Sequence, residues 1–169
     1  MNNQDRELDL KQTMSTYGRM LYKICFIMMK NTYDTEDVIQ DTLLQYYVDM
    51  PKFDSEEHKK AWLIRVSQNK CKNLLKYKKR HSYVQLEKIE ECLPHGKNYN
   101  NDDMEEFIEL AKLDYKYKSV IVLHYIENFS VEETADILEI SKSAVKMRLK
   151  RGREKLKRTY EKYYAEEVL

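Results

Sequence analysis

The sequence is poor in the residues that form tight turns. It contains 3 glycines and 2 prolines in 169 residues, about 3% together, whereas average proteins contain roughly 12%. Sheets and hairpins need these residues at their turns, so long helices with few connections are expected instead. The shortage excludes collagen-like chains and turn-rich β architectures, and it predicts an all-α fold.

Cysteines and long apolar runs are also scarce. The 3 cysteines (Cys25, Cys71 and Cys92) are an odd number without CxxC spacing, which excludes a disulfide scaffold and indicates a reducing compartment. Residues 1–12 are polar and acidic, unlike a secretory signal, and the longest strongly apolar run, 24–29, is far too short to span a membrane. We therefore expect a cytoplasmic protein without membrane insertion.

The net charge of +1 conceals a strong partition along the chain. Residues 51–80 carry a net charge of +7 and residues 141–169 a net charge of +6, while residues 81–110 carry −6. Two basic segments separated by an acidic one suggest two contact surfaces for a polyanion, tethered to each other. The alternative is a pair of ordinary lysine-rich helix faces in contact with solvent.

Apolar periodicity predicts helices over 15–30, 34–47 and 56–79, with Asp34 as a helix cap. Periodicity fails over 81–104, where Pro94 and Gly96 occur, and at most one helical turn is expected there, over 86–92. Helices are expected again over 104–113, 115–128, 131–138 and 143–163. The prediction is two small helical domains, 1–80 and 105–169, joined by a flexible acidic linker over 81–104.

The strongest local signal is a helix-turn-helix over 130–158. Ser130 and Glu133 have the spacing of a capping box, and Ser141 can cap the next helix after a short turn at Glu139. In that helix Val145 and Leu149 begin a buried stripe, whereas nine basic residues and one acid occur between 142 and 158. A capped short helix followed by a helix with a basic outer face is typical of major-groove readers. A helical hairpin with a lysine-rich surface is the alternative.

A second basic surface is predicted on the helix over 56–79. No acidic residue occurs between Lys59 and Arg80, and the helical period places the apolar positions, Tyr77 included, on one face. A loop containing Phe53 precedes the helix, and aromatic rings beside basic residues suit single-stranded DNA, because unpaired bases stack on them. The opposite, polar stripe consists of Arg65, Gln68, Asn69, Lys72, Lys76 and Lys79.

Three stretches of the chain resemble the extracytoplasmic-function (ECF) sigma factors of the sigma-70 family. Residues 34–44 (DTEDVIQDTLL) resemble the family's AEDLVQETFL helix, and residues 61–69 (AWLIRVSQN) resemble its AWLYRIARN segment. Residues 113–156 resemble the family's C-terminal segment. The resemblance covers most of 15–160 in the right order. It implies a sigma factor that binds core RNA polymerase and directs promoter-specific transcription initiation.

The resemblance implies roles for specific residues in the two domains. The first domain, 1–80, would bind the polymerase clamp and open the minus-ten element, and the second, 105–169, would read the minus-thirty-five element as duplex. The resemblance further implies an anti-sigma factor as a partner. The implied clamp-binding residues are Asp37, Gln40, Asp41 and Leu44. Those for the melted minus-ten strand are Phe53, Arg65, Asn69, Lys72 and Lys76. Those for the minus-thirty-five groove are Lys142, Ser143, Lys146, Met147, Arg148, Lys150 and Arg151.

The clamp assignment has independent support from helical spacing. Asp37, Gln40, Asp41 and Leu44 follow one another at i, i+3, i+4 and i+7, away from the expected core positions of the same helix. A leucine framed by acids on an outer helix face is typical of a partner surface.

The residues give less support to other functions. Asp34, Asp37 and Asp41 could hold magnesium in an enzyme, but the expected capping and clamp-binding roles already account for these aspartates. Cys92 and His95 are too few for zinc, which needs three or four ligands. We expect no catalytic residue, metal or cofactor. A stand-alone helix-turn-helix regulator is the main alternative, and a sigma-like adapter without promoter activity is another.

Overall fold

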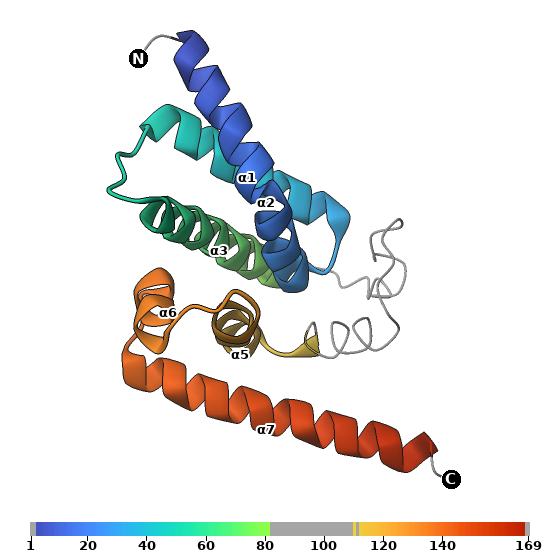
Figure 1. The fold of residues 1–169 in the computed structure, drawn as a ribbon. Coiled ribbons are helices and arrows are strands. Elements are labelled where there is room, and N and C mark those ends of the chain that lie inside the picture. The colour runs from blue at the N-terminus through green and yellow to red at the C-terminus, as the bar shows by residue number, and fades with distance from the viewer. Residues whose placement is uncertain (1–2, 82–109, 111, 168–169) are drawn as a thin grey trace. The chain divides into compact units, whose positions relative to one another are not determined.

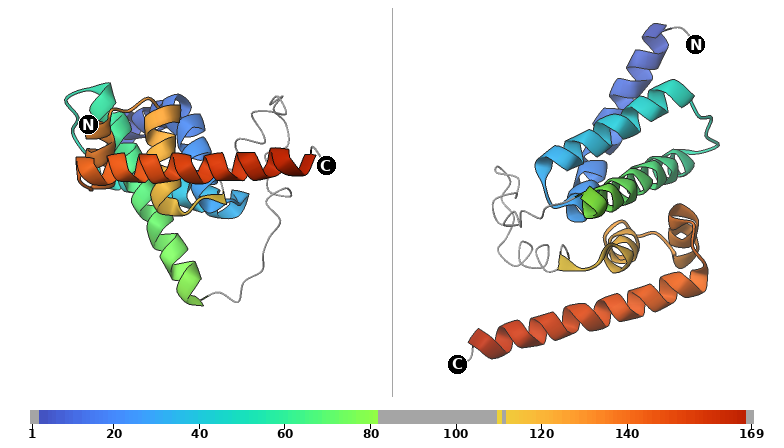
Figure 2. Two further views of the ribbon diagram at one scale, coloured as in Figure 1. Left: turned by 90° about the horizontal axis from the view of Figure 1, so that it is seen from below. Right: turned by 180° about the vertical axis from the view of Figure 1, so that it is seen from behind.

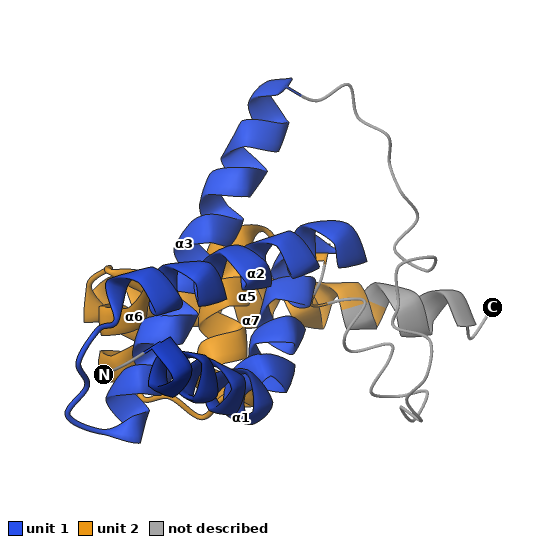
Figure 3. Cartoon of the chain, turned by 90° about the horizontal axis from the view of Figure 1, so that it is seen from above, with its two compact units in different colours: residues 1–93 blue, residues 94–169 orange. Residues whose placement is uncertain are grey.

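The computed structural model describes residues 3–81, 110 and 112–167, except the side chains of 160 and 162–167. Within these ranges the chain is all-α, which confirms the predicted fold class (Figure 1). It divides into two compact units, Met1–Leu93 and Pro94–Leu169 (Figure 3). Apart from His81, the linker expected over 81–104 lies outside the described residues, as do the helical turn expected over 86–92 and most of the helix expected over 104–113.

The first unit is built from α1 (Asn3–Met29), α2 (Thr32–Asp49) and α3 (Glu56–His81). Each of these helices packs against the other two (Figures 1 and 2). The three stripes of apolar side chains meet in one core, whose burial is the main source of stability in a bundle of this size. Its residues include Leu21, Ile24, Ile27, Val38, Leu43, Leu63, Ile64 and Cys71.

The predicted start of the first helix, at residue 15, is wrong, because α1 begins at Asn3. The additional turns are polar, and tertiary contacts hold them in place. The Asp9 carboxylate accepts hydrogen bonds from the Tyr46 hydroxyl (2.5 Å) and from the Lys59 ammonium (3.2 Å). Such partners lie far away along the chain, so apolar periodicity could not reveal them.

The predicted cap of α2 is also wrong. Asn31, and not Asp34, is the N-cap, and its side-chain oxygen accepts a hydrogen bond from the Asp34 backbone N–H (2.8 Å). The Asp34 carboxylate is buried and accepts instead from Lys78 and from the Asn31 side-chain amide. The start of α2 is thereby tied to the end of α3.

A buried tyrosine links α1 to the start of α3. The Tyr17 hydroxyl donates to the Glu56 carboxylate (2.5 Å), and burial together with this hydrogen bond raises the pKa of Tyr17 to about 12. Tyr17→Phe is expected to lower the free energy of unfolding by about 1 kcal/mol near neutral pH. Because the folded state holds the proton more tightly, this contribution is fully present below the ordinary pKa of 10.0 and is lost as pH rises through about 12. Urea titrations of both proteins check this, and equal stability near neutral pH would contradict it.

The second unit contains α5 (Tyr115–Ile121), the π-helical turn η2 (Val122–Ile126), α6 (Val131–Leu138) and α7 (Lys142–Glu167). Both α5 and α6 pack on α7, which extends well past them (Figure 2). The helix expected over 115–128 is α5 followed by η2, whose π-helical turn is wider than an α-helical one. A hydrogen bond from the Glu127 N–H to the Val122 carbonyl (3.0 Å) closes this turn. Residues that fill this core include Tyr117, Val120, Ile121, Leu123, Ile137, Val145 and Leu149.

Gly152 allows α7 to approach α5 closely. A Cβ atom at this position would lie 2.7 Å from Ile121 Cδ1 and 3.4 Å from Tyr117 Cβ, and both neighbours are buried. We expect Gly152→Ala to lower the stability of this unit by about 1 kcal/mol, because the overpacking cost exceeds the gain in helix propensity. Thermal unfolding checks this prediction. The matched control is Ser143→Ala, at an exposed site on the same helix, and an equal shift in both variants would contradict it.

Candidate functional site

The outer face of α2 carries the four residues predicted to bind a partner protein, and the structure brings them together. Asp37, Gln40 and Asp41 are exposed, and Leu44 is 61% exposed. The opposite face of the helix is buried in the core through Val38, Leu43 and Tyr46, so this surface has no packing role within the unit.

Two apolar residues that the sequence reasoning missed extend this face. Tyr33 is 84% exposed and Val48 is 67% exposed, and both fall in line with Leu44 at helical spacing. The same spacing, extended one turn in each direction, would have found them. We call the complete set the outer α2 stripe: Tyr33, Asp37, Gln40, Asp41, Leu44 and Val48. Three large uncovered apolar side chains framed by acids are typical of a docking surface.

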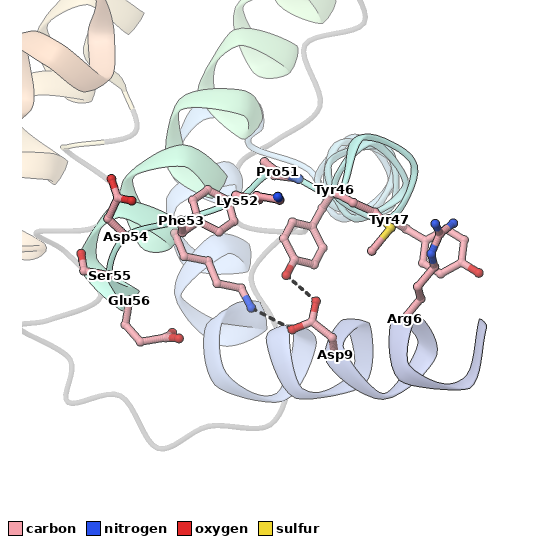
Figure 4. Close-up of a pocket in the computed structure, with 12 residues that line it drawn as sticks. Arg6, Asp9, Tyr46, Tyr47, Pro51, Lys52, Phe53, Asp54, Ser55 and Glu56 are labelled. Atoms are coloured by element: carbon pink, nitrogen blue, oxygen red, sulfur yellow. Dashed lines mark hydrogen bonds and ion pairs between the residues drawn. The ribbon is translucent and has the colours of Figure 1, made fainter. Parts of the chain in front are cut away.

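A pocket of about 740 Å³ lies where the start of α1, the end of α2 and the loop before α3 meet (Figure 4). Asp9 of α1 lines the pocket, and its bonds to Tyr46 and Lys59 are drawn in Figure 4. Burial lowers the pKa of Lys59, but the hydrogen bonds to Tyr46 and Asp9 outweigh it, so the net pKa is raised. Lys59 therefore stays charged at physiological pH and forms an ion pair with Asp9 in the pocket wall.

Phe53, predicted to contact a single strand, lines this pocket on the loop before α3. Its ring is half-buried and packs with Tyr46 (6.3 Å between centroids) and Trp62 (5.9 Å). The aromatic cluster fixes the loop, and it leaves part of the Phe53 ring available at the pocket. The sequence placed Phe53 near the basic helix, but it did not reveal the pocket.

Most of the predicted polar stripe of α3 is on the surface. Asn69, Lys72, Lys76 and Lys79 are exposed, and Arg65 is half-buried. Two predictions on this helix are wrong. Gln68, expected on the polar stripe, is buried, and Tyr77, expected on the apolar face, is 59% exposed. The helical period places Tyr77 on the apolar face, but α1 and α2 do not cover it. Its side chain therefore lies outside the core.

The helix-turn-helix of the second unit has the predicted local structure. The Ser130 hydroxyl accepts from the Glu133 N–H (3.1 Å), and the Glu133 carboxylate accepts from the Ser130 N–H (2.7 Å), which completes the capping box. Glu139 then takes the left-handed backbone conformation (φ 55°), and the Ser141 hydroxyl accepts from the Ala144 N–H (3.1 Å) at the start of α7. These caps fix the angle between α6 and α7.

The predicted groove-reading residues share the outer face of α7. The inner face packs into the core through Val145 and Leu149, and Arg148 is half-buried. Basic residues and one apolar residue, Met147, thus project from the first three turns. The exposed members of the predicted set are Lys142, Ser143, Lys146, Met147, Lys150 and Arg151.

Glu132 is a member of this surface that the sequence reasoning missed. Its carboxylate lies 3.3 Å from the Lys142 ammonium, and both side chains are exposed. The carboxylate of Glu132 accepts hydrogen bonds from its own backbone N–H and from Lys142, and these bonds hold the pKa of Glu132 below its usual range. Glu132 therefore links α6 to the first turn of α7 and partly neutralises the charge of Lys142, the first of the lysines predicted to contact the groove.

The described part of the chain shows neither a metal cluster nor a membrane-spanning helix. Residues 3–81, 110 and 112–167 contain no group of three or more His, Cys, Asp or Glu side chains arranged to hold a metal ion. Of the three aspartates considered for magnesium, Asp34 is bonded to Lys78 and Asn31, as described above. Among these residues there is also no helix long and apolar enough to cross a membrane.

Comparisons with known proteins agree for both units. The family described as sigma-70 region 2 matches residues 13–81, and the family described as sigma-70, region 4 matches residues 109–156. The ECF RNA polymerase sigma factor SigW of Bacillus subtilis (strain 168) is 31% identical over 158 residues, which are 84% of this chain and 83% of SigW. RNA polymerase sigma factor SigV of the same organism is 28% identical over 133 residues, 78% of each chain.

Two solved structures share the fold. The sigma factor RpoE of Bartonella quintana, solved in complex with the anti-sigma factor NepR, superposes with a TM-score of 0.75 at 23% identity, covering 90% of this chain and 97% of RpoE. CnrH, solved in complex with the cytosolic domain of CnrY, superposes with a TM-score of 0.65 at 25% identity, covering 92% of this chain and 89% of CnrH.

Proposed function

Because the chain belongs to the extracytoplasmic-function sigma factors of the sigma-70 family and directs RNA polymerase to promoters, we propose how its two units divide that work. The proposed division is that residues 1–80 bind the polymerase and the melted minus-ten element, residues 105–169 bind the minus-thirty-five duplex, and residues 81–104 join them. Each step is recognition, and the chain itself carries out no catalysis. The bonds of the transcript would be formed by the polymerase, in the cytoplasm, without a cofactor from this chain.

The outer α2 stripe is the proposed polymerase-binding surface. Leu44 would be an apolar anchor, because a side chain that becomes fully desolvated in a well-packed interface contributes more to affinity than contacts at the rim. Asp37 and Asp41 would pair with basic groups of the clamp and exclude partners of the wrong charge. Tyr33 and Val48 would enlarge the apolar contact at the two ends of the stripe.

The polar stripe of α3 and the Phe53 pocket are the proposed site for the melted minus-ten strand. Lys72 and Lys76 would contact phosphates, and Asn69 and Arg65 would contact bases or sugars. The pocket of about 740 Å³ is large enough for a base that has left the stack, and the exposed part of the half-buried Phe53 ring would offer it an aromatic contact. Capturing unpaired bases in this way stabilises the open duplex.

The outer face of α7 is the proposed reader of the minus-thirty-five element. Side chains in the first turns, from Lys142 to Met147, would reach base edges in the major groove, whereas Lys150 and Arg151 would meet phosphates. We also propose an anti-sigma factor as a partner, because the structural neighbour RpoE was solved with one.

The observation that carries the proposal is the uncovered outer α2 stripe, since a stand-alone regulator has no need of a docking surface for polymerase. The test is run-off transcription from a pool of host genomic fragments, with core polymerase in the presence and absence of this protein. We expect discrete new transcripts whose templates share a two-part upstream element. A shifted duplex without polymerase, and no new transcripts, would favour the stand-alone regulator instead. If neither appeared, an adapter role would remain, to be tested by binding to the isolated clamp.

A further inference from the structure

An aromatic pair lies outside the core at the end of α3. The rings of Tyr77 and His81 are stacked, with 4.2 Å between centroids and 26° between planes, and both residues are exposed. His81 Nδ1 lies 2.8 Å from the Tyr77 carbonyl oxygen, and because a carbonyl can only accept, Nδ1 carries the proton and donates. One hydrogen bond and one ring contact therefore hold the pair in a fixed arrangement.

The surroundings of the pair are strongly basic. Arg80 is exposed one helical turn beyond Tyr77, Lys76 and Lys79 are exposed on the other faces of the same turns, and the sequence has no acidic residue between Lys59 and Arg80. Lys78, the remaining cation of this turn, is bonded to Asp34 and holds the end of α3 against α2. A single exposed tyrosine needs no explanation, but two stacked rings within a basic surface match the faces and phosphates of a nucleic acid.

We propose that the Tyr77–His81 pair is a stacking platform for an unpaired base of the promoter strand. This rests on the proposed binding of the melted strand along α3, and it adds a second aromatic contact to that site. Tyr77 is 21 residues beyond the start of α3 at Glu56, so at 1.5 Å per residue it lies about 30 Å from the Phe53 pocket. The pocket and the platform would thus hold the strand near opposite ends of α3, with the platform on a different face of the helix from the polar stripe.

A competing explanation is that the pair only stabilises the end of α3. Aromatic side chains at i and i+4 support a helix, and a ring N–H that donates to a carbonyl of the last turn helps to end it. That role predicts that substitution of Tyr77 changes thermal stability and has the same effect on DNA binding whichever base is unpaired. Stacking predicts unchanged thermal stability and an effect on DNA binding that depends on which base is unpaired.

The test uses the full chain bound to core polymerase and a DNA fork based on the promoter found by run-off transcription. The unpaired strand carries the fluorescent base 2-aminopurine at one position at a time, since stacking on an aromatic ring quenches it. We expect one position to be quenched by wild type and by Tyr77→Phe, but not by Tyr77→Leu. The affinity of Tyr77→Leu for the fork should fall at least about fivefold, the lower end for loss of one stacking contact. Tyr125→Leu, an exposed tyrosine of the other unit, is the matched control.

Any of four results would overturn the platform. Unchanged quenching by Tyr77→Leu with a lower melting temperature would leave only the helix-ending role. An equal loss of affinity for fully paired DNA would indicate a duplex contact. If Lys72→Ala and Lys76→Ala weaken fork binding while Tyr77→Leu does not, the platform is wrong and the proposed minus-ten site stands. If none of the three variants changes fork binding, the proposed minus-ten site on α3 fails as well.

Discussion

The double substitution Asp41→Lys and Leu44→Glu is expected to weaken binding to core polymerase by more than about 100-fold. Truncating a central apolar anchor typically costs about 2 kcal/mol or more, and a reversed charge beside it adds repulsion. Both side chains are exposed on the outer α2 stripe, so neither substitution removes a core contact. The stability of the fold should therefore be unchanged while polymerase binding is lost.

The measurement is the affinity of the labelled chain for core polymerase, with circular dichroism and thermal unfolding of each variant as the folding check. Met14→Glu is the matched control, because Met14 is 59% exposed on α1 and lies outside the stripe. Unchanged affinity of the double variant would show that this face of α2 does not contact the polymerase. A similar loss for Met14→Glu would mean that the contact is not specific to the stripe.

Substitutions on α7 are expected to separate base reading from phosphate binding. Lys146→Ala should reduce promoter use by about 1–3 kcal/mol, equivalent to about 5- to 150-fold, and should relax the preference at one base pair of the minus-thirty-five element. Lys146 is exposed in the second turn of α7, within reach of base edges. Arg151 is exposed farther along the helix, so Arg151→Ala should weaken all sequences alike and reduce the salt dependence by about one charge.

Transcription from the promoter and from single-base variants of it, at two salt concentrations, distinguishes these effects. Lys116→Ala is the control, because Lys116 is an exposed lysine of the same unit that lies on α5 and outside the helix-turn-helix. A uniform loss across sequences for Lys146→Ala would make Lys146 a phosphate contact. Loss of preference at one base pair for Arg151→Ala would instead make Arg151 a reader of bases.

Local signals in the sequence were sufficient for much of the fold. The capping box of Ser130 and Glu133 depends on side chains three residues apart, and the left-handed turn at Glu139 lies between two caps, so neither needs a distant partner. The exposed position of Leu44 followed from helical spacing alone. The all-α class followed from the shortage of turn residues.

Several of the differences arise where residues far apart in the sequence meet. The N-terminal turns of α1 depend on Asp9, which bonds to residues of α2 and α3, and Asp34 is a partner of Lys78 instead of a cap. The burial of Gln68 depends on which helices cover α3, and its spacing alone could not predict it.

By itself the sequence determined the helices, the two basic surfaces and the resemblance to sigma factors, because periodicity, capping and charge are local properties of the chain. Only the tertiary structure decided that a pocket forms beside Phe53, that Glu132 reaches Lys142, and that Tyr77 stays outside the core. These features depend on how helices pack, and packing is set by the shapes of side chains that meet only in the folded chain.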